Sequence, residues 1–327
     1  MLTFVDLFCG GGFGARGAVS AGATPLLAVD AWDLATETYK HNFPEAEVLT
    51  ERIENVVPRK YARKYQPDVL LTSPECTSHS IARGARPGCE QSKETALGII
   101  PWMRALKPRW VIVENVPRMK KWDGLASLIQ DIRGQKYEVS PLELNAADFG
   151  APQARKRMFL VCDRMGTKIT KEDLLKLHRR QRKSAASIID WSGQYKSRPL
   201  YSPNRAKATI ERAERAMTEL GKNKDFLIVY YGSDYAGGWQ RLEDPLRTVT
   251  TLDRFGLVTW KNGEPQLRML QPPELLKAMC GNNSKHQLPV GSRRDKVKLC
   301  GNGVCSPVTE IIFKKLNELA LLELDVA

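Results

Sequence analysis

Cys76 is the side chain whose surroundings most favour chemistry. It lies in a polar turn, residues 73–79 (Ser-Pro-Glu-Cys-Thr-Ser-His), directly after the apolar run 69–72. A lone cysteine is more often a small buried hydrophobe than a nucleophile. Serine, threonine, glutamate and histidine around a thiol are poorly explained as core, and they favour an exposed, reactive sulfur. The turn therefore indicates a cysteine nucleophile, with His79 either assisting the thiolate or merely packing.

Glu114 is the second candidate, because it ends a strongly apolar run, residues 110–113. A carboxyl group in a low-dielectric cleft has a raised pKa and can hold or donate a proton. A helix cap or an ion pair would explain the same position. Residues 153–157 (Gln-Ala-Arg-Lys-Arg) add two guanidinium groups, Arg155 and Arg157, which can stabilise a developing negative charge.

A glycine loop, residues 6–12 (Asp-Leu-Phe-Cys-Gly-Gly-Gly), precedes a helix of small residues at 15–21. Glycines in this setting let the backbone approach a nucleotide-like ligand. The loop matches neither GxGxxG with its usual spacing nor GxxxxGK[ST], which disfavours pyrophosphate. Asp30, about 20 residues further on, can accept hydrogen bonds from ribose hydroxyls. Because of Asp30, an adenosine-bearing cofactor fits this loop. Phe8 either stacks on the adenine of such a cofactor or packs in the core.

Buried strands are predicted to position these motifs. Short apolar runs alternate with helical patterns in the first 162 residues, and the predicted strands are residues 4–7, 26–29, 69–72, 110–113 and 158–161. This alternation predicts a parallel α/β sheet. Ligands bind such sheets at the carboxyl ends of the strands. Because we expect each polar motif to follow a strand, all of them should meet in one cleft.

Composition sets the outer limits. The chain has 327 residues, ample for one large and one small domain. No apolar run approaches the ~20 residues of a membrane span, and the first residues lack a signal-peptide pattern, which predicts a cytoplasmic protein. The seven cysteines are scattered without paired CxxC spacing, so we expect reduced thiols and no metal.

A basic second domain is predicted between residues 166 and 244. The net charge of the chain is +13, and residues 168–224 hold 15 Lys or Arg against 6 Asp or Glu, a local excess of 9. A polyanionic partner or a solvated helical surface would explain this excess. The expected organisation is 1–165, 166–244 and a C-terminal segment 245–327 that returns to the first domain. Expected elements are helices 171–183, 205–221, 273–279 and 306–322 and a β segment at 247–251.

With these motifs in order, the chain resembles the DNA (cytosine-5) methyltransferases of bacterial or phage type from residue 4 to about 312, except over 166–244. The resemblance implies an α/β, Rossmann-like S-adenosylmethionine-dependent methyltransferase sheet with a second, smaller target-recognition domain. It also implies a monomeric, cytoplasmic enzyme of restriction-modification type that acts on double-stranded DNA. The implied cofactor is S-adenosylmethionine, and the residues implied to bind it are Phe8, Gly10, Gly12, Asp30 and Asn302.

The resemblance assigns Cys76 as the nucleophile and Glu114 as a contact of the target cytosine. A thiolate that adds to carbon 6 activates carbon 5, and a proton or hydrogen bond at ring nitrogen 3 eases the addition. A guanidinium suits the ring oxygen, with Arg157 first and Arg155 next. The chain departs from the family at Glu75 and Thr77, where proline and glutamine usually flank the nucleophile, and at Ala31, where an aromatic residue is usual.

Three hypotheses follow from the sequence. The first is a DNA cytosine-5 methyltransferase that extrudes its target base from the duplex. The second is a tRNA cytosine-5 methyltransferase with the same cleft chemistry. The third is a non-catalytic DNA-binding homologue, which the altered turn around Cys76 would explain and which the retained Glu114 and Arg157 oppose.

Overall fold

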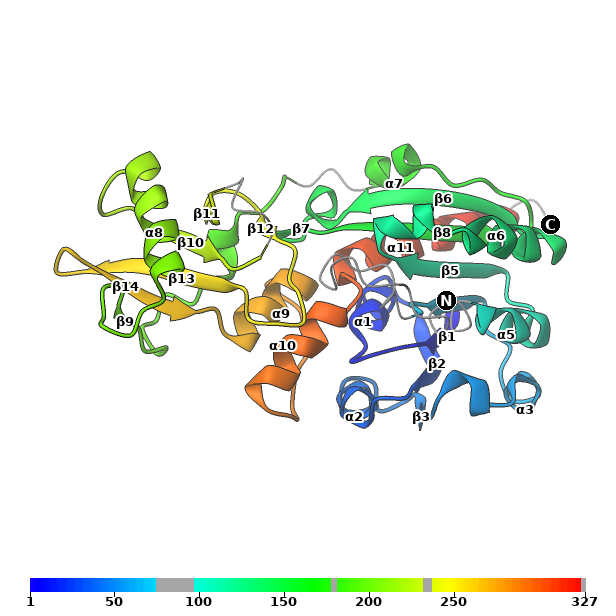
Figure 1. The fold of residues 1–327 in the computed structure, drawn as a ribbon. Coiled ribbons are helices and arrows are strands. Elements are labelled where there is room, and N and C mark those ends of the chain that lie inside the picture. The colour runs from blue at the N-terminus through cyan, green and yellow to red at the C-terminus, as the bar shows by residue number, and fades with distance from the viewer. Residues whose placement is uncertain (75–96, 178–180, 232–236, 325–327) are drawn as a thin grey trace.

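The computed structural model of the protein describes residues 1–74, 97–177, 181–231 and 237–324. Two sheets lie side by side, a large one on the right of Figure 1 and a smaller one on the left. We call the part built around the large sheet the catalytic unit and the part built around the smaller sheet the second unit. No helix in the described ranges is long and apolar enough to cross a membrane.

The large sheet contains seven strands. In spatial order they are β3 (Glu47–Thr50), β2 (Thr24–Asp30), β1 (Thr3–Leu7), β4 (Val69–Thr72), β5 (Trp110–Asn115), β8 (Lys156–Asp163) and β6 (Glu138–Asn145). The first five run parallel. All five predicted strands are present, whereas β3 and β6 were not predicted. Polar residues interrupt both, and β6 contains Pro141, which a strand at the edge of a sheet tolerates.

Strand β8 is the exception to the expected parallel arrangement, because it runs antiparallel to both β5 and β6. The short connection from Asn145 to Lys156 explains this, since a parallel crossover needs a dozen or more residues. Residues 153–157 therefore lead into their strand instead of following one, and Lys156 and Arg157 are its first two residues. Because β8 runs in the opposite direction, its start lies at the edge where β5 ends. Residues 153–157 therefore still lie near Glu114, as expected, but for a different reason.

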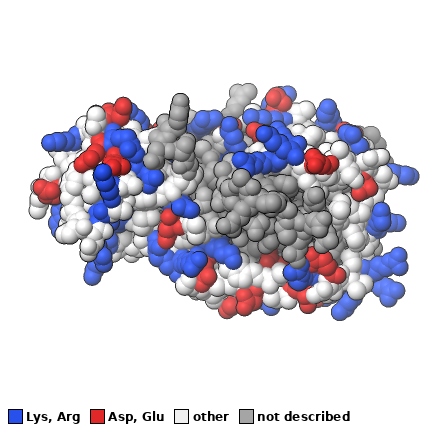
Figure 2. All heavy atoms as spheres, in the orientation of Figure 1, with Lys and Arg blue, Asp and Glu red and all other residues white. Residues whose placement is uncertain are grey.

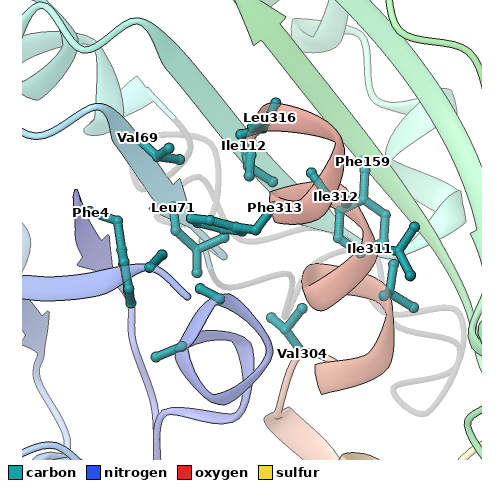
Figure 3. Packing of buried hydrophobic residues seen from close by; sticks show 14 of the residues in the cluster. Phe4, Val69, Leu71, Ile112, Phe159, Val304, Ile311, Ile312, Phe313 and Leu316 are labelled. Atoms are coloured by element: carbon teal, nitrogen blue, oxygen red, sulfur yellow. The ribbon is translucent and has the colours of Figure 1, made fainter. Parts of the chain in front are cut away.

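Helices cover both faces of the large sheet (Figure 1). One apolar cluster joins the sheet to α1 (Phe13–Ser20), α2 (Asp33–Asn42), α7 (Lys171–Leu177) and α11 (Ser306–Leu324). The other joins it to α3 (Pro58–Ala62), α5 (Ile99–Leu106) and α6 (Gly124–Gly134). Figure 3 shows Ile312, Phe313 and Leu316 of α11 directed at side chains of β1, β4 and β5. The predicted helices 15–21 and 306–322 are α1 and α11.

Helices α1 and α11 approach each other closely, because α1 carries small residues. A β-carbon on Gly17 would lie 2.0 Å from Thr309 Oγ1 and 2.2 Å from the Ser306 carbonyl oxygen. The Thr309 hydroxyl donates to the Gly14 carbonyl at 3.0 Å, and the Ser306 hydroxyl donates to the Phe13 carbonyl at 2.7 Å. The helix after the glycine loop is thus fixed by the last helix of the fold.

The smaller sheet is antiparallel throughout. Its strands, in spatial order, are β11 (Trp239–Arg241), β10 (Phe226–Val229), β13 (Phe255–Lys261), β14 (Glu264–Met269) and β9 (Arg198–Pro199). Helix α8 (Lys207–Leu220), predicted at 205–221, packs on it. Because β13 and β14 lie beyond residue 244, this sheet extends past the expected boundary. Ile169 and Leu174 belong to the catalytic core, so residues just after 165 pack with the first unit.

The remaining elements either complete the catalytic unit or connect it to the second unit. They are the short helices η1 (Ile53–Asn55), η3 (Pro117–Lys121), η4 (Ala146–Phe149) and η5 (Ala185–Ile188), the helices α9 (Pro272–Cys280) and α10 (Arg293–Asn302), and the paired strands β7 (Gln153–Ala154) and β12 (Leu246–Arg247). Helix α9 matches the predicted helix 273–279. In the region 247–251 only Leu246–Arg247 forms a strand, and α7 ends at Leu177, within the helix predicted at 171–183.

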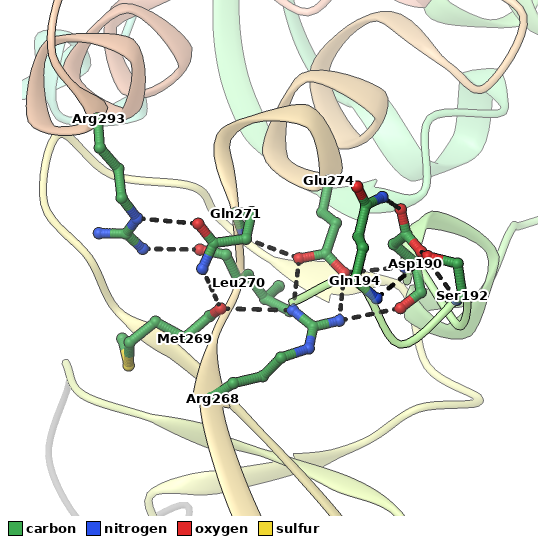
Figure 4. Close-up of polar contacts among 9 residues, drawn as sticks. All are labelled: Asp190, Ser192, Gln194, Arg268, Met269, Leu270, Gln271, Glu274 and Arg293. Carbon is green, nitrogen blue, oxygen red and sulfur yellow. Dashed lines mark hydrogen bonds and ion pairs between the residues drawn. The ribbon is translucent and has the colours of Figure 1, made fainter. Parts of the chain in front are cut away.

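A buried ion pair fixes the smaller sheet to α9. Arg268 of β14 donates to both carboxylate oxygens of Glu274, at 2.8 and 2.7 Å, and their side chains are 8% and 1% exposed. The same carboxylate accepts from the backbone N–H groups of Asp190 and Gln271 (Figure 4). Arg268 also donates to the Asp190 carbonyl. Because each charge is paired and hydrogen-bonded, burial of this pair is tolerated.

Candidate functional site

Glu114 and Arg157 form an ion pair at the edge where β5 ends and β8 begins. Arg157 Nε lies 3.2 Å from Glu114 Oε1. Glu114 is 7% exposed, and burial raises the pKa of its carboxyl group, although the Arg157 and Arg155 charges act in the opposite direction. The Glu114 Oε1 atom has no partner with hydrogen-bond geometry in the described part of the chain. This carboxyl group can therefore share a proton with a ring nitrogen placed beside it.

Arg155, two residues before Arg157, has a different environment. It is 2% exposed, and its guanidinium donates to the carbonyl oxygens of Val249, Gly301 and Gly303, each at 2.9 Å. Burial lowers the pKa of Arg155 to about 9, and the Arg157 charge adds to this effect. Its two terminal nitrogens are thus satisfied by protein carbonyls. Its Nε has no partner in the described residues. This geometry favours a supporting position behind Glu114 and Arg157, and a contact of Arg155 with a substrate stays a prediction.

Gln153, two residues before Arg155, complements its contacts. Its side chain accepts from the Val249 N–H at 2.8 Å and donates to the Ala278 carbonyl at 3.2 Å, and it is completely buried. Strand β12 pairs in parallel with β7, and the Thr248 hydroxyl donates to the Ala154 carbonyl. These contacts join residues 153–157 to the connection between the two units. Sequence reasoning noted Gln153 only as part of a motif and did not predict this role.

Cys76 lies outside the described residues, together with Glu75, Thr77 and His79. The chain leading to it is described as far as Pro74, whose carbonyl accepts from the Asn115 amide at 3.5 Å, at the long limit for a hydrogen bond. The Ser73 hydroxyl donates to the Phe8 carbonyl at 2.9 Å. Pro74 therefore lies beside the residue that follows Glu114, and Ser73 lies beside the glycine loop. The sequence signal for Asn115 was its place directly after Glu114.

The glycine loop has the features of a ligand-facing turn. Phe8 is half-buried and has φ +56°, a left-handed conformation that is unusual for a large side chain and occurs at functional sites. Gly10 has φ +50°, and a β-carbon there would meet nothing within 4 Å. A β-carbon on Gly12, by contrast, would lie 2.6 Å from the Phe43 ring. The loop thus turns back against α2 at Gly12 and is open at Gly10.

Asp30 ends β2 beside this loop. Its two carboxylate oxygens accept from the N–H groups of Gly10 at 2.8 Å and Trp32 at 2.9 Å. Burial raises the pKa of Asp30, and these backbone hydrogen bonds oppose the rise. Each oxygen retains a second lone pair for a hydroxyl donor. The Lys298 ammonium lies 4.2 Å from the centre of the Trp32 ring, so the aromatic side chain after Ala31 is held beside α10.

Asn302 is exposed at the last position of α10. The flanking residues Gly301 and Gly303 are the ones whose carbonyls accept from Arg155. A β-carbon on Gly301 would lie 2.3 Å from the Thr250 backbone, so only glycine allows this approach. The Gly-Asn-Gly-Val segment is therefore connected to residues 153–157 through Arg155.

His286 was not predicted to belong to this region. It is 3% exposed, its ring lies 4.8 Å from that of Phe13, and neither ring nitrogen has a partner with full hydrogen-bond geometry in the described residues, although the Gly11 backbone interacts with the ring. Burial lowers the pKa of His286 to about 3, so the ring is neutral near pH 7. Its position in a loop after α9 gave no sequence signal. It forms part of the packing behind the glycine loop.

The described ranges contain no group of three or more His, Cys, Asp or Glu residues that could hold a metal ion. The described cysteines are all free thiols: Cys9, Cys162, Cys280, Cys300 and Cys305. Burial raises the pKa of the Cys9 thiol well above its usual range. Protonated, buried thiols are poor nucleophiles. The described cysteines therefore do not compete with Cys76 for a catalytic role.

Basic side chains surround the start of β8 and the second unit. Lysine and arginine side chains are scattered over both units on the face drawn in Figure 2, with acidic side chains among them. Lys156, Lys171 and Arg182 line an open pocket of about 260 Å³, where Asp148 pairs with Arg182 at 2.6 Å. Arg179 and Arg180, two expected phosphate contacts, lie outside the described residues.

Comparisons with known proteins agree with this geometry. A family model described as C-5 cytosine-specific DNA methylase matches residues 2–318. The type II methyltransferase M.HgiDI of Herpetosiphon aurantiacus is 27% identical over 226 residues, which span 64% of this chain and 72% of that protein. A human tRNA (cytosine(38)-C(5))-methyltransferase is 29% identical over 144 residues, 42% of this chain and 36% of that protein.

The fold is also found among solved structures. A DNMT2 mutant of Spodoptera frugiperda superposes with a TM-score of 0.69 at 18% identity, over 96% of this chain and 99% of that one. At this level of identity the likeness establishes the architecture, a mixed α/β fold with a large, mostly parallel sheet.

Proposed function

Because this chain belongs to the C-5 cytosine-specific DNA methylase family, whose methyl donor is S-adenosylmethionine, we propose that it methylates carbon 5 of a cytosine in double-stranded DNA. The observation that carries the proposal is the Glu114–Arg157 pair, which lies at the sheet edge reached by Pro74 and by the glycine loop. A carboxyl group, a guanidinium and the segment leading to a cysteine are thus brought together from three distant parts of the chain.

Cys76 is proposed to add as a thiolate to carbon 6 of the cytosine, forming a sulfur–carbon bond and an enamine. Carbon 5 then becomes nucleophilic and receives a methyl group. Loss of the carbon-5 proton and release of the thiolate regenerate Cys76. The target base must leave the duplex for this chemistry, at a cost of a few kcal/mol that protein contacts offset.

Glu114 is proposed to hold the proton that ring nitrogen 3 receives as the thiolate adds. Its raised pKa, caused by burial, keeps more of the carboxyl group protonated than in water. Arg157, whose side chain is 16% exposed, is proposed to donate to the ring oxygen, where negative charge develops. Arg155 is proposed as a positioning residue, because its donors already serve Val249, Gly301 and Gly303.

The glycine loop fits an adenosine-bearing cofactor. The open space at Gly10 admits a ligand against the backbone, and the remaining lone pairs of Asp30 suit ribose hydroxyls. We propose that Phe8, Gly10, Gly12 and Asp30 hold S-adenosylmethionine, with Asn302 exposed beside them. When bound, this cofactor supplies an electrophilic methyl group.

The second unit is proposed to recognise the DNA target. The charge excess of residues 168–224 supports a polyanionic partner. We further propose that the protein acts as a monomer in the cytoplasm of a bacterial or phage-infected cell, as part of a restriction-modification system. The likeness to the human tRNA methyltransferase favours folded RNA as the second candidate substrate.

Covalent trapping tests the proposal. Duplex DNA with 5-fluorocytosine at the target position should give an adduct with wild-type protein and S-adenosylmethionine, because the fluorine cannot leave as the proton does. Cys76→Ser should give no adduct and no transfer while it still binds the cofactor, and Cys162→Ser serves as a control thiol. An adduct with 5-fluorocytosine tRNA instead of DNA would support the second candidate. A folded wild-type protein that traps neither would be the non-catalytic homologue.

A further inference from the structure

An open pocket lies in the second unit where β11 meets β12. Its volume is about 250 Å³, and it is lined by Trp239, Gln240, Arg241, Asp244, Pro245 and Arg247. It therefore combines two guanidinium groups, one carboxylate and one aromatic ring. The reaction at Glu114 uses none of these groups.

The guanidinium groups of Arg241 and Arg247 have unused donors. In the described ranges no carbonyl or carboxylate accepts from either guanidinium, and the Arg241 guanidinium lies 5.8 Å from the centre of the Trp239 ring. Neighbouring arginines differ: Arg268 is saturated by Glu274 and Asp190, and Arg254 donates to the Tyr230 carbonyl. Unused donors beside an aromatic surface are suited to a partner from outside the chain.

The pocket is held in shape by Gln240. This side chain is 6% exposed, accepts from the Arg247 N–H at 2.9 Å and donates to the Pro245 carbonyl at 3.3 Å. It thereby fixes the turn that carries Asp244 and Arg247. Residues two apart on a strand share a face, so Trp239 and Arg241 point the same way from β11. The backbone that carries the polar groups is therefore fixed before a ligand arrives.

Strand pairing places this pocket near the catalytic residues. Arg247 pairs with Ala154, and Arg157 follows Ala154 by three residues. Three fully extended residues span at most about 10 Å, and the hydrogen bond from the Arg155 N–H to the Gln153 carbonyl shortens this path. One step of B-DNA is about 3.4 Å. A base read here would lie within about three base pairs of the target cytosine.

The chemistry of the pocket selects a base edge over a phosphate. A guanidinium matches O6 and N7 of guanine with two parallel donors, and a carboxylate accepts from the amino group of cytosine. Asp244 would repel a phosphate placed between Arg241 and Arg247. We propose that this pocket reads a guanine–cytosine pair, with Arg241 donating to the guanine and Asp244 accepting from its paired cytosine. This assignment rests on the proposed methylation of duplex DNA.

The test uses the full-length protein, S-adenosylmethionine and a pool of duplexes with random bases around a central cytosine, sequenced after bisulfite treatment. Wild-type protein should prefer a guanine at one position within about three base pairs of the methylated cytosine. Arg241→Lys, which keeps the charge but loses the paired donors, should reduce the preference there by roughly tenfold to a hundredfold. Asp244→Asn should weaken the same position, whereas Lys207→Gln, an exposed cation elsewhere in the unit, should leave it unchanged.

Two results would overturn the assignment. In the first, Arg241→Lys keeps the wild-type sequence preference, and Arg241→Gln lowers the rate of methylation equally on all duplexes. This result would identify Arg241 as a phosphate contact. In the other, the wild-type motif has no guanine in this interval. Absence of methylation on every duplex by folded wild-type protein would instead reject the proposed function, and this inference with it. Circular dichroism and cofactor binding establish that each variant is folded.

Discussion

The arginines at the Glu114 edge of the large sheet and those in the pocket beside β11 are used in opposite ways. In the catalytic unit, Arg155 is buried and its terminal nitrogens donate to three backbone carbonyls, and Arg157 is paired with Glu114. In the second unit, Arg241 and Arg247 line an open pocket. A reaction centre needs groups fixed before substrate arrives, because fixed groups do not have to reorganise during reaction. A recognition surface needs donors that the protein itself has not used.

The largest expected effect is on the rate of methyl transfer after a substitution of Glu114. Glu114→Gln should lower the single-turnover rate of methyl transfer by roughly 10²- to 10⁴-fold, because proton donation to the ring is lost. Cofactor affinity should change little, since Asp30 and the glycine loop are untouched. Glu143→Gln, an exposed carboxylate on the neighbouring β6 that pairs with Lys120, is the matched control. A rate equal to that of wild type would remove Glu114 from the reaction.

The free energy of unfolding should distinguish the buried Arg155 from the exposed Arg241. Arg155→Gln should reduce the free energy of unfolding by about 3–5 kcal/mol, because buried carbonyls lose their donors. Arg241→Gln should change it by no more than about 0.5 kcal/mol, as is usual for exposed sites. Urea denaturation of both variants measures the contrast. Equal losses would mean that Arg241 is as structural as Arg155.

A substitution of Asp30 tests whether the proposed cofactor site at the glycine loop also depends on a side chain that is already fixed by hydrogen bonds. Asp30→Ala should weaken S-adenosylmethionine binding roughly tenfold to a hundredfold, since a charged acceptor for ribose hydroxyls and for the Gly10 N–H is removed. Calorimetric titration measures this affinity, and Asp33→Ala at the exposed start of α2 is the control. Unchanged affinity in the Asp30 variant would reject its ribose assignment.

The last expected effect concerns pH and the buried His286. Its folded pKa is about 3, below the usual value of about 6.5, so the unfolded chain binds a proton that the folded protein does not. Stability should therefore fall as pH drops from about 6.5 towards 3, by at most about 1.4 kcal/mol per pH unit. The stability difference between wild type and His286→Asn should be smaller at pH 5 than at pH 7.5.

The control for this titration is His41→Asn, at the exposed end of α2. A difference between wild type and His286→Asn that stays constant with pH would mean that His286 does not titrate on unfolding.

Sequence reasoning predicted the parts of the molecule in which residue type reports local structure. The five apolar runs are strands, and Glu114, Arg157, Asp30 and the glycine loop lie at the predicted sheet edge. The direction of β8 could not be predicted, because an antiparallel strand buried on both faces has the same apolar composition as a parallel one.

Long-range contacts account for the remaining differences. The role of Arg155 depends on carbonyls about a hundred or more residues away, at Val249, Gly301 and Gly303. Backbone carbonyls carry no sequence signal, since every residue has one. The pairing that places β13 and β14 in the smaller sheet is also non-local. Candidate reactive residues can therefore be predicted from the sequence more readily than the distant residues that position them.

The contact of α1 with α11 has a consequence for how the protein is made. The helix behind the cofactor loop closes against residues 306–316, near the end of the chain, through Gly17, Ser306 and Thr309. Domains generally fold as units during synthesis, from the N-terminus onward. Here α1 is synthesised almost 300 residues before α11, the helix against which it packs. The glycine loop therefore gains its support from α11 only after the second unit has been synthesised.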